Sequence, residues 1–144
     1  MGGYGGGRQE LERLVLYTIT TAGSGTGTST GTNNSLSRYH HGMVVADVTF
    51  TTGTAPTLVI YLDSKLDGTT FVNLARFAAI TTNGQYVAVV TKEQKVNALV
   101  GDVLADAGAG TIRNLGWGDD MRVRHSISDA TSQFSARVWF VGIG

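Results

Sequence analysis

Two stretches near the C-terminus alternate apolar and polar residues with a period of two. The first is Met121-Arg122-Val123-Arg124-His125-Ser126-Ile127-Ser128, and the second is Phe134-Ser135-Ala136-Arg137-Val138-Trp139-Phe140-Val141-Gly142. Successive side chains of a β-strand point to opposite faces, so each stretch predicts a strand with one face in a core. The β-branched and aromatic residues within them are also typical of strands. These two segments decide the fold class.

The same period continues through the chain upstream of these segments. It predicts five further strands, at 14–20, 44–50, 57–63, 71–80 and 85–91. In the strand at 44–50, the residues expected to share a face are Val44, Ala46, Val48 and Phe50. In the strand at 14–20, they are Leu14, Leu16, Thr18 and Thr20, with Val15, Tyr17 and Ile19 opposite. The segment 71–80 also fits a helix face, but its turn-bounded neighbours favour a bulged strand.

Seven strands of this kind predict an all-β fold, namely a two-sheet antiparallel β-sandwich that is jelly-roll-like. The turns Asp67-Gly68 and Asn83-Gly84 fit tight hairpins, because these dipeptides adopt positive φ readily. Between the fifth and sixth strands, apolar residues recur at helical spacing within 95–107, which predicts one short helix or a long loop there. The glycine-rich stretch 108–119 is expected to be loop.

The length of 144 residues predicts one domain preceded by an arm. Residues 1–13 form the arm, which is glycine-rich and expected to be flexible unless a neighbour orders it. Residues 14–144 form the sandwich domain. Within it, the Gly/Thr-rich stretch at 22–35 has no apolar residue larger than alanine, and it predicts a long surface loop.

Composition excludes several classes of function. The chain has no cysteine, so disulfides, thiolate metal sites and cysteine nucleophiles are absent. Eleven basic and eleven acidic residues give a formal net charge of zero, which argues against nucleic acid or an anionic membrane as the partner. No apolar run approaches the roughly 20 residues of a membrane span, and the start of the chain lacks the apolar core of a secretory signal.

No motif in the chain predicts a catalytic, cofactor or metal site. The segment Asp63-Ser64-Lys65-Leu66-Asp67-Gly68 fails as a calcium loop, because Lys65 occupies the third ligand position, and a hairpin turn explains it better. The neighbouring His40 and His41 would point to opposite faces of a strand, so they are expected to be exposed and not to share a metal. The glycine-rich segments lack the spacing of a phosphate-binding loop, and no nucleophile-elbow motif is present.

Other polar and aromatic clusters have structural explanations. Asp119-Asp120 followed by Arg122 and Arg124 suggests acid–base chemistry, but cross-strand ion pairing is the favoured interpretation. His125 is expected to be a hydrogen-bonded inner or interface histidine. The aromatic residues Trp117, Trp139, Tyr61 and Tyr86 suggest a sugar-stacking platform, although packing in cores and interfaces is their commoner use.

Several segments together resemble a group of small structural proteins of tailed bacteriophages. They are Val44-Val45-Ala46-Asp47-Val48-Thr49, Gly53-Thr54-Ala55-Pro56-Thr57-Leu58-Val59-Ile60, Leu66-Asp67-Gly68-Thr69-Thr70-Phe71, Met121-Arg122-Val123-Arg124 and Phe134-Ser135-Ala136-Arg137-Val138. The resemblance spans about 42–144 and does not extend to the arm or to 95–118. It implies a virion location, no enzymatic activity, and a role as a head or tail component.

Among such roles, a capsid decoration (cement) protein fits the residues best. A neutral, compact body can sit on the outer shell, and an extended arm can tie neighbouring capsomers. The expected partners are therefore the major capsid protein and other copies of this chain, with a trimer as the expected assembly. The predicted tether residues are Tyr4, Arg8, Leu11 and Leu14, and a face containing Val59 and Trp139 is the predicted inter-subunit surface.

Two alternatives remain open at this point. One is a head–tail connector or tail protein of the same particle, which copy number per particle separates from decoration. The other is a carbohydrate-binding module of a tail fibre that uses Trp117 and Tyr61. All three predict synthesis in the host cytoplasm, and decoration places the product on the capsid surface.

Overall fold

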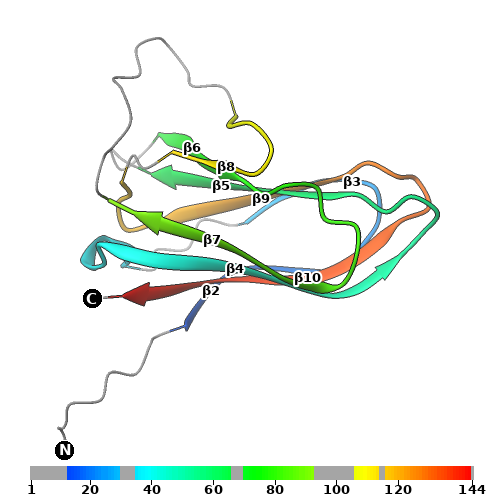
Figure 1. Cartoon of the computed structure of the whole chain (residues 1–144), viewed down its shortest axis with the longest axis horizontal. Helices are drawn as coiled ribbons and strands as arrows, with labels where there is room; N and C mark the ends of the chain where they lie inside the picture. Colours follow the sequence, from blue (N-terminus) through cyan, green and yellow to red (C-terminus); the bar gives the residue numbers. More distant parts are fainter. Residues whose placement is uncertain (1–12, 30–34, 66–69, 93–105, 114–115, 144) are drawn as a thin grey trace, which may run out of the picture.

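The structure is a computed structural model, and it describes residues 13–29, 35–65, 70–92, 106–113 and 116–143. Two layers of antiparallel strands lie face to face (Figure 1). The strands are β2 (Arg13–Ala22), β3 (Gly25–Thr28), β4 (His41–Thr52), β5 (Leu58–Lys65), β6 (Phe71–Arg76), β7 (Gly84–Thr91), β8 (Thr111–Ile112), β9 (Met121–Ile127) and β10 (Gln133–Ile143). One 3₁₀ turn, η1 (Leu36–Arg38), precedes β4. The two-sheet antiparallel sandwich predicted from the sequence is confirmed.

The strand order is that of a jelly roll. One sheet has the order β2-β10-β4-β7, and the other has the order β3-β9-β5-β6-β8. Without the two-residue β8, eight strands remain. Successive strands of the chain pass from one sheet to the other, except that β5 and β6 form a hairpin within one sheet, and this is the double Greek-key pattern. Seven of these eight match the strands expected from the sequence.

The two strands that the sequence did not predict are short and poor in apolar residues. β3 lies inside the stretch 22–35, which was expected to be loop, and it pairs with β9 from Gly25↔Ile127 to Thr28↔Arg124. β8 lies inside the expected loop 108–119 and pairs with β6 at Ala75↔Ile112 and Arg76↔Thr111. Both are edge strands held by backbone pairing, which a pattern of side chains does not reveal. The predicted helix within 95–107 falls almost entirely outside the described residues, and so does the turn at Asp67-Gly68.

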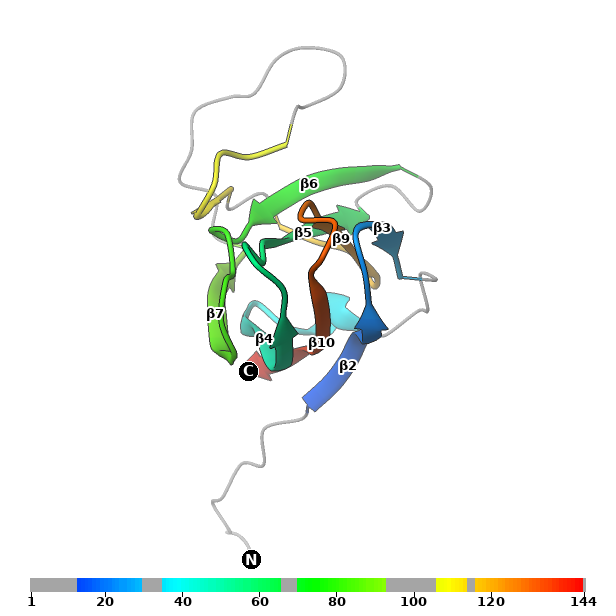
Figure 2. The same cartoon turned by 90° about the vertical axis from the view of Figure 1, so that its right-hand side faces the viewer.

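The two sheets face each other in the end-on view (Figure 2). The buried hydrophobic side chains of both sheets form one core between them. The inner face of the four-stranded sheet contributes Val44, Ala46 and Val48 of β4, Val90 of β7, and Phe134, Ala136, Val138 and Phe140 of β10. The facing sheet contributes Leu58, Ile60, Leu62, Leu74, Met121, Val123 and Ile127. The alternation predicted for β9 and β10 is therefore correct along both strands.

Two β-bulges correct the predicted facing of β2 and β4. In β10, Val138 pairs with Tyr17 and Trp139 pairs with Val15, so Leu16 is an extra residue. Beyond this bulge the inner positions of β2 change from even to odd numbers, and Ile19 is buried while Thr18 and Thr20 are exposed. A bulge reverses which residues face the core because the side-chain period of a strand is two.

The second bulge has the same effect at the far end of β4. Ser135 pairs with Phe50 and Ala136 pairs with Val48, so Thr49 is the extra residue. Phe50 was expected to share the face of Val48, but Val48 is buried in the core and Phe50 is 40% exposed. The prediction for Val44, Ala46 and Val48 is correct, and the prediction for Phe50 is wrong.

Two glycines in the central strands make room for aromatic rings of the core. Gly42 of β4 lies opposite Gly142 of β10. A Cβ at Gly42 would lie 2.5 Å from the ring of Phe140, and a Cβ at Gly142 would lie 2.3 Å from the ring of Tyr39. The rings of Tyr39 and Phe140 lie 5.6 Å apart and tilted, so this glycine pair fixes the aromatic packing at one end of the core.

Replacement of Phe140 by alanine tests this packing. The side chain is fully buried and also meets Trp117 edge to face at 6.0 Å, so we expect Phe140→Ala to lower the free energy of unfolding by about 3–5 kcal/mol. Val89→Ala on the exposed face, where the side chain is 67% exposed, is the matched control and should change it by less than about 0.5 kcal/mol. Urea denaturation of both variants measures the difference, and equal losses would contradict the assigned core.

Candidate functional site

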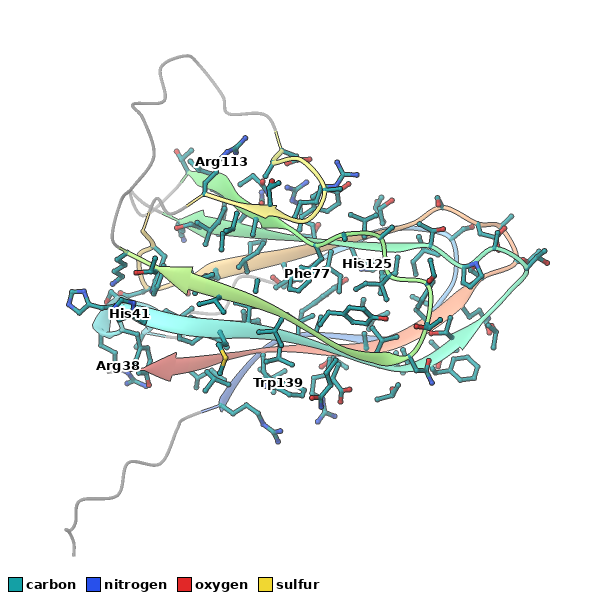
Figure 3. The ribbon with its side chains drawn as sticks, viewed as in Figure 1. Arg38, His41, Phe77, Arg113, His125 and Trp139 are labelled. Carbon is teal, nitrogen blue, oxygen red and sulfur yellow. The ribbon has the colours of Figure 1, made fainter. Side chains whose placement is uncertain are left out.

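The outer surface of the four-stranded sheet is apolar over one half of its length. Two cross-strand rows form this surface, because the register places Val15, Trp139, Val45 and Val87 side by side across all four strands, followed by Val141, Met43 and Val89 in the next row. We call these seven residues the outer apolar face. Trp139 lies near its centre on β10, directed away from the core (Figure 3).

Three valines of the outer apolar face are largely exposed. The exposed fraction is 49% for Val15, 52% for Val87 and 67% for Val89. Trp139 itself is only 8% exposed, because its neighbours and the Arg13 guanidinium, 4.8 Å from the ring centroid, cover it. An antiparallel sheet with one solvated face normally presents polar residues there, and a contiguous apolar surface marks an interaction site.

Polar residues border the outer apolar face on the same sheet. The adjacent cross-strand row consists of Thr18, Arg137, Asp47 and Gln85. A shallow depression of about 310 Å³ lies here, lined mainly by threonine, serine, Asp47 and Arg137. The sheet surface therefore divides into an apolar half and a polar half, a pattern typical of a protein-binding surface with a polar rim.

The outer surface of the five-stranded sheet holds a cluster of charges around Asp63. This carboxylate is 1% exposed and accepts hydrogen bonds from Arg124 (Nε, 2.7 Å; Nη2, 2.9 Å), from Arg122 (Nε, 2.9 Å) and from the Asn73 amide (3.0 Å). Burial alone would raise the pKa of Asp63, but the bonds from Arg124, Asn73 and Arg122 outweigh it and hold this pKa below its usual value.

Every member of this cluster has a partner, so the cluster acts as a structural clamp. Arg124 also bonds Asp106 at 2.8 Å and stacks over Tyr61 at 4.6 Å, while Arg122 stacks over Phe71 at 4.4 Å. Asn73 in turn accepts a hydrogen bond from the Ala107 backbone at 2.8 Å. The clamp therefore joins β5, β6 and β9 to the segment after residue 105.

The sequence predicted cross-strand ion pairs for Arg122 and Arg124, and this prediction is confirmed with a different acid. The partner is Asp63 of β5, which lies directly opposite Arg122 in the register. Asp120, one of the two acids considered, pairs instead with Lys65 at 3.6 Å. From the sequence, the acids nearest to the two arginines in the chain were considered as their partners. The structure instead pairs β5 with β9, which brings Asp63 beside both arginines.

The structure separates the two residues predicted to form one inter-subunit face. Trp139 belongs to the outer surface of the four-stranded sheet. Val59 lies between the core residues Leu58 and Ile60 on β5, so its side chain points to the outer surface of the other sheet. The two residues therefore lie on opposite faces of the sandwich, and only the face with Trp139 carries the contiguous apolar rows.

The predicted tether residues are divided between the sheet and the arm. Leu14 is part of β2 and packs half-buried against the core, so it is a structural residue of the sandwich. Tyr4, Arg8 and Leu11 lie outside the described residues. Arg13, the first residue of β2, fixes where the arm begins, at the border of the outer apolar face.

The histidines have the structural positions that the sequence favoured. His40 and His41 are not buried, and His41 Nδ1 lies 3.0 Å from the Thr91 hydroxyl. His125 is 7% exposed, and its Nδ1 lies 2.8 Å from the Tyr17 hydroxyl, which confirms an inner, hydrogen-bonded histidine. Burial lowers the pKa of His125.

Trp117 is not available as a sugar-stacking surface. It is 6% exposed, its indole N–H donates to the Leu36 carbonyl at 2.8 Å, and its ring packs against Phe140. The platform of Trp117 and Tyr61 considered from the sequence is therefore wrong, because Tyr61 lies on the outer surface under Arg124 while Trp117 is in the core.

Sequence reasoning missed most of the outer apolar face and the role of Asp63. The signal for the face was present, since the runs 43–46, 87–90 and 138–141 are apolar at consecutive positions and so predict strands that are apolar on both faces. Which of these runs lie side by side depends on strand order, which the sequence did not provide.

Comparison of the chain with protein-family models, curated proteins and solved structures finds no match. Within the described ranges, no group of three or more histidine, aspartate or glutamate side chains is arranged to hold a metal ion. No helix in that part of the chain is long and apolar enough to cross a membrane. The outer apolar face is therefore the feature from which function is inferred.

Substitution of Asp63 tests the clamp. Asp63→Asn removes the buried negative charge that Arg122 and Arg124 bind, and we expect it to lower the free energy of unfolding by about 2–3 kcal/mol. This loss is smaller than that for breaking a fully buried ion pair, because both arginines are partly exposed to solvent. Asp106→Asn, which alters a 42% exposed partner of the same Arg124, should lower it by less than about 1 kcal/mol. Denaturation above about pH 6 measures both variants, and equal losses would contradict the clamp.

The buried His125 predicts a loss of stability on acidification. Its folded-state pKa is depressed below the usual value of 6.5, so the unfolded chain takes up a proton first as the pH falls through about 6.5. Protonation therefore favours the unfolded state, and the free energy of unfolding should decrease between about pH 7.5 and about pH 5.5. His125→Gln should flatten this dependence, whereas the exposed His41→Gln should retain it. Urea denaturation curves recorded over this pH range measure the dependence. If the free energy of unfolding of His125→Gln fell with pH as steeply as that of the unaltered protein, the role given to His125 would be contradicted.

Proposed function

We propose that this protein is a non-enzymatic structural protein of a tailed-phage particle that decorates the outer surface of the capsid. The observation that supports this role is the outer apolar face, with three valines between 49% and 67% exposed on one sheet surface. Removing the remaining exposed area of such a valine from water contributes on the order of 1 kcal/mol per side chain. A surface of this kind is expected to be covered in the working assembly.

A repeated protein lattice is the partner that suits this surface. The face runs across all four strands of one sheet, and it is apolar with a border of threonine, Arg137 and Asp47. The formal net charge of zero removes long-range repulsion between copies placed close together on a shell. The jelly roll is used by viral capsid domains and by lectins, and it is compatible with this role without requiring it.

The arm adds a second attachment at the same place. Arg13 begins β2 and stacks on Trp139, so residues 1–12 start from the border of the outer apolar face. Tyr4, Arg8 and Leu11 are the arm residues proposed to tie neighbouring subunits. A face and an arm that bind together gain affinity over either alone, and a protein that binds only the assembled shell shifts it away from disassembly.

Binding of purified protein to expanded shells assembled without it tests the proposal. The double variant Val87→Thr/Val89→Thr keeps the shape of both exposed side chains and removes apolar surface, so it should fold normally and bind shells about tenfold more weakly. Val59→Thr makes the same substitution on the opposite face of the sandwich and should leave binding unchanged. A chain that lacks residues 1–12 should remain folded and should also bind more weakly.

Two results would overturn the decoration role. Equal binding by the unaltered protein and by the Val87→Thr/Val89→Thr variant would show that the outer apolar face is not the docking surface. A copy number limited to a single ring per particle, measured by quantitative mass spectrometry of virions, would assign the protein to the head–tail connector or the tail. A copy number comparable with that of the shell subunit supports decoration.

A further inference from the structure

A histidine and a tyrosine form a polar pair between the two sheets, beside β3. Nδ1 of His125 lies 2.8 Å from the Tyr17 hydroxyl, and the two ring centroids are 5.6 Å apart. His125 belongs to β9 and Tyr17 belongs to β2, so the pair joins one sheet to the other. Histidine is the side chain whose charge ordinarily changes near neutral pH, and here it is buried.

The backbone of β3 covers this pair. Gly27 lies directly opposite His125 in the register. A Cβ at Gly27 would lie 2.5 Å from Cε1 of His125 and 2.5 Å from the hydroxyl oxygen of Tyr17. Only a residue without a side chain allows so close an approach. The two polar groups are therefore shielded from solvent on this side by β3 itself.

β3 is held in place by few contacts. It is an edge strand of four residues, and within the described part of the chain it pairs only with β9 (Figure 2). Gly25, Thr26 and Thr28 are exposed, so little apolar surface holds the strand down. Segments of this kind open locally at a lower free energy than the whole fold. β9 is also paired with β5, so His125 stays in the sheet when β3 leaves.

We propose that β3 is a pH-sensitive strand, which separates from β9 when His125 is protonated while the rest of the sandwich stays folded. The inference goes beyond the stability of the whole fold, because it assigns the response to acid to one element. It is independent of the proposed function and can be tested on the protein alone. Separation of β3 uncovers the edge of β9, and a free sheet edge is a template for pairing with another strand.

A proton on His125 places a positive charge where no group in the described structure neutralises it. Tyr17 is the titratable side chain that faces the ring, and burial raises its pKa, so it stays neutral. β3 supplies only glycine and threonine, Ile60 lies opposite on β5, and the inner positions of β10 are apolar. Arg124 and Asp63 bond each other on the outer face of the sheet. An unpaired buried charge is costly, and contact with water relieves this cost.

Protonation also disturbs the hydrogen bond of the pair. In the neutral ring one nitrogen carries a hydrogen and the other accepts, so Nδ1 can accept the hydrogen bond of the Tyr17 hydroxyl. In the protonated ring both nitrogens carry hydrogens, and the hydroxyl has to turn its own hydrogen to another acceptor. Since Gly27 lies against both groups, neither can move without displacing β3.

The direction and the size of the effect follow from linkage. Burial lowers the pKa of His125 while β3 is closed, whereas an open strand returns this pKa toward about 6.5. The open form therefore binds the proton more tightly, and its population rises as the pH falls through about 6.5. Between about pH 7.5 and about pH 5.5 the population of the open form should rise by up to about tenfold.

Hydrogen exchange followed by NMR tests the proposal. The Ser29 amide, which donates to the Val123 carbonyl at 2.8 Å, reports on β3 together with the amides of 25–28. After correction for the intrinsic exchange rate, their protection should fall by up to about tenfold over this pH range. The Arg113 amide, which donates to the Leu74 carbonyl at 2.8 Å near the opposite edge of the same sheet, is the matched control and should keep its protection.

Variants assign the response to one histidine. His125→Gln should remove the pH dependence at β3, and the exposed His41→Gln should retain it. The amides of β10 should stay more protected than those of β3 throughout, because they open only with the whole fold. Protection at β3 that does not change with pH, or that equals the protection of β10, overturns the proposal.

A disulfide that ties β3 to β9 provides a second test, which does not depend on the folding of His125→Gln. Thr26 and Ser126 lie directly opposite each other, and the natural chain has no cysteine. In the oxidised Thr26→Cys/Ser126→Cys protein, β3 cannot separate, so His125 should titrate at a lower pH than in the reduced form of the same protein. NMR titration of the ring protons measures both forms, with His41 as the internal control. An equal pKa of His125 in the two forms contradicts the proposal.

Discussion

The structure depends on β10, which is the strand that the four-stranded sheet is built around. It pairs with β2 on one side and with β4 on the other, and its inner positions, Phe134, Ala136, Val138 and Phe140, supply much of that sheet's share of the core. Its outer positions include Trp139 and Val141 of the outer apolar face. Successive residues of a strand point to opposite faces. The residues of β10 that alternate with the core positions therefore form part of the candidate binding surface.

The fold class and most strands could be predicted because alternation is a local property. β9 and β10 follow it without interruption, and the sequence assigned every inner residue of both correctly. Alternation fails to predict which residues face the core beyond Leu16 in β2 and Thr49 in β4. Each of these is an extra residue in a β-bulge, and a bulge reverses the facing of the residues that follow it. A bulge depends on how two strands pair, so alternation within the strand alone put Phe50 on the face of Val48, whereas pairing with β10 leaves Phe50 exposed.

The candidate site was harder to predict because it exists only across strands. The Val15, Trp139, Val45 and Val87 row joins residues that are far apart in the sequence, and strand order alone makes them neighbours. The Asp63 clamp has the same origin, since its two arginines were identified as ion-pairing residues but their acid lies some sixty residues upstream on β5. Apolar runs on both faces of a strand were the usable signal, and they mark a surface without showing its extent.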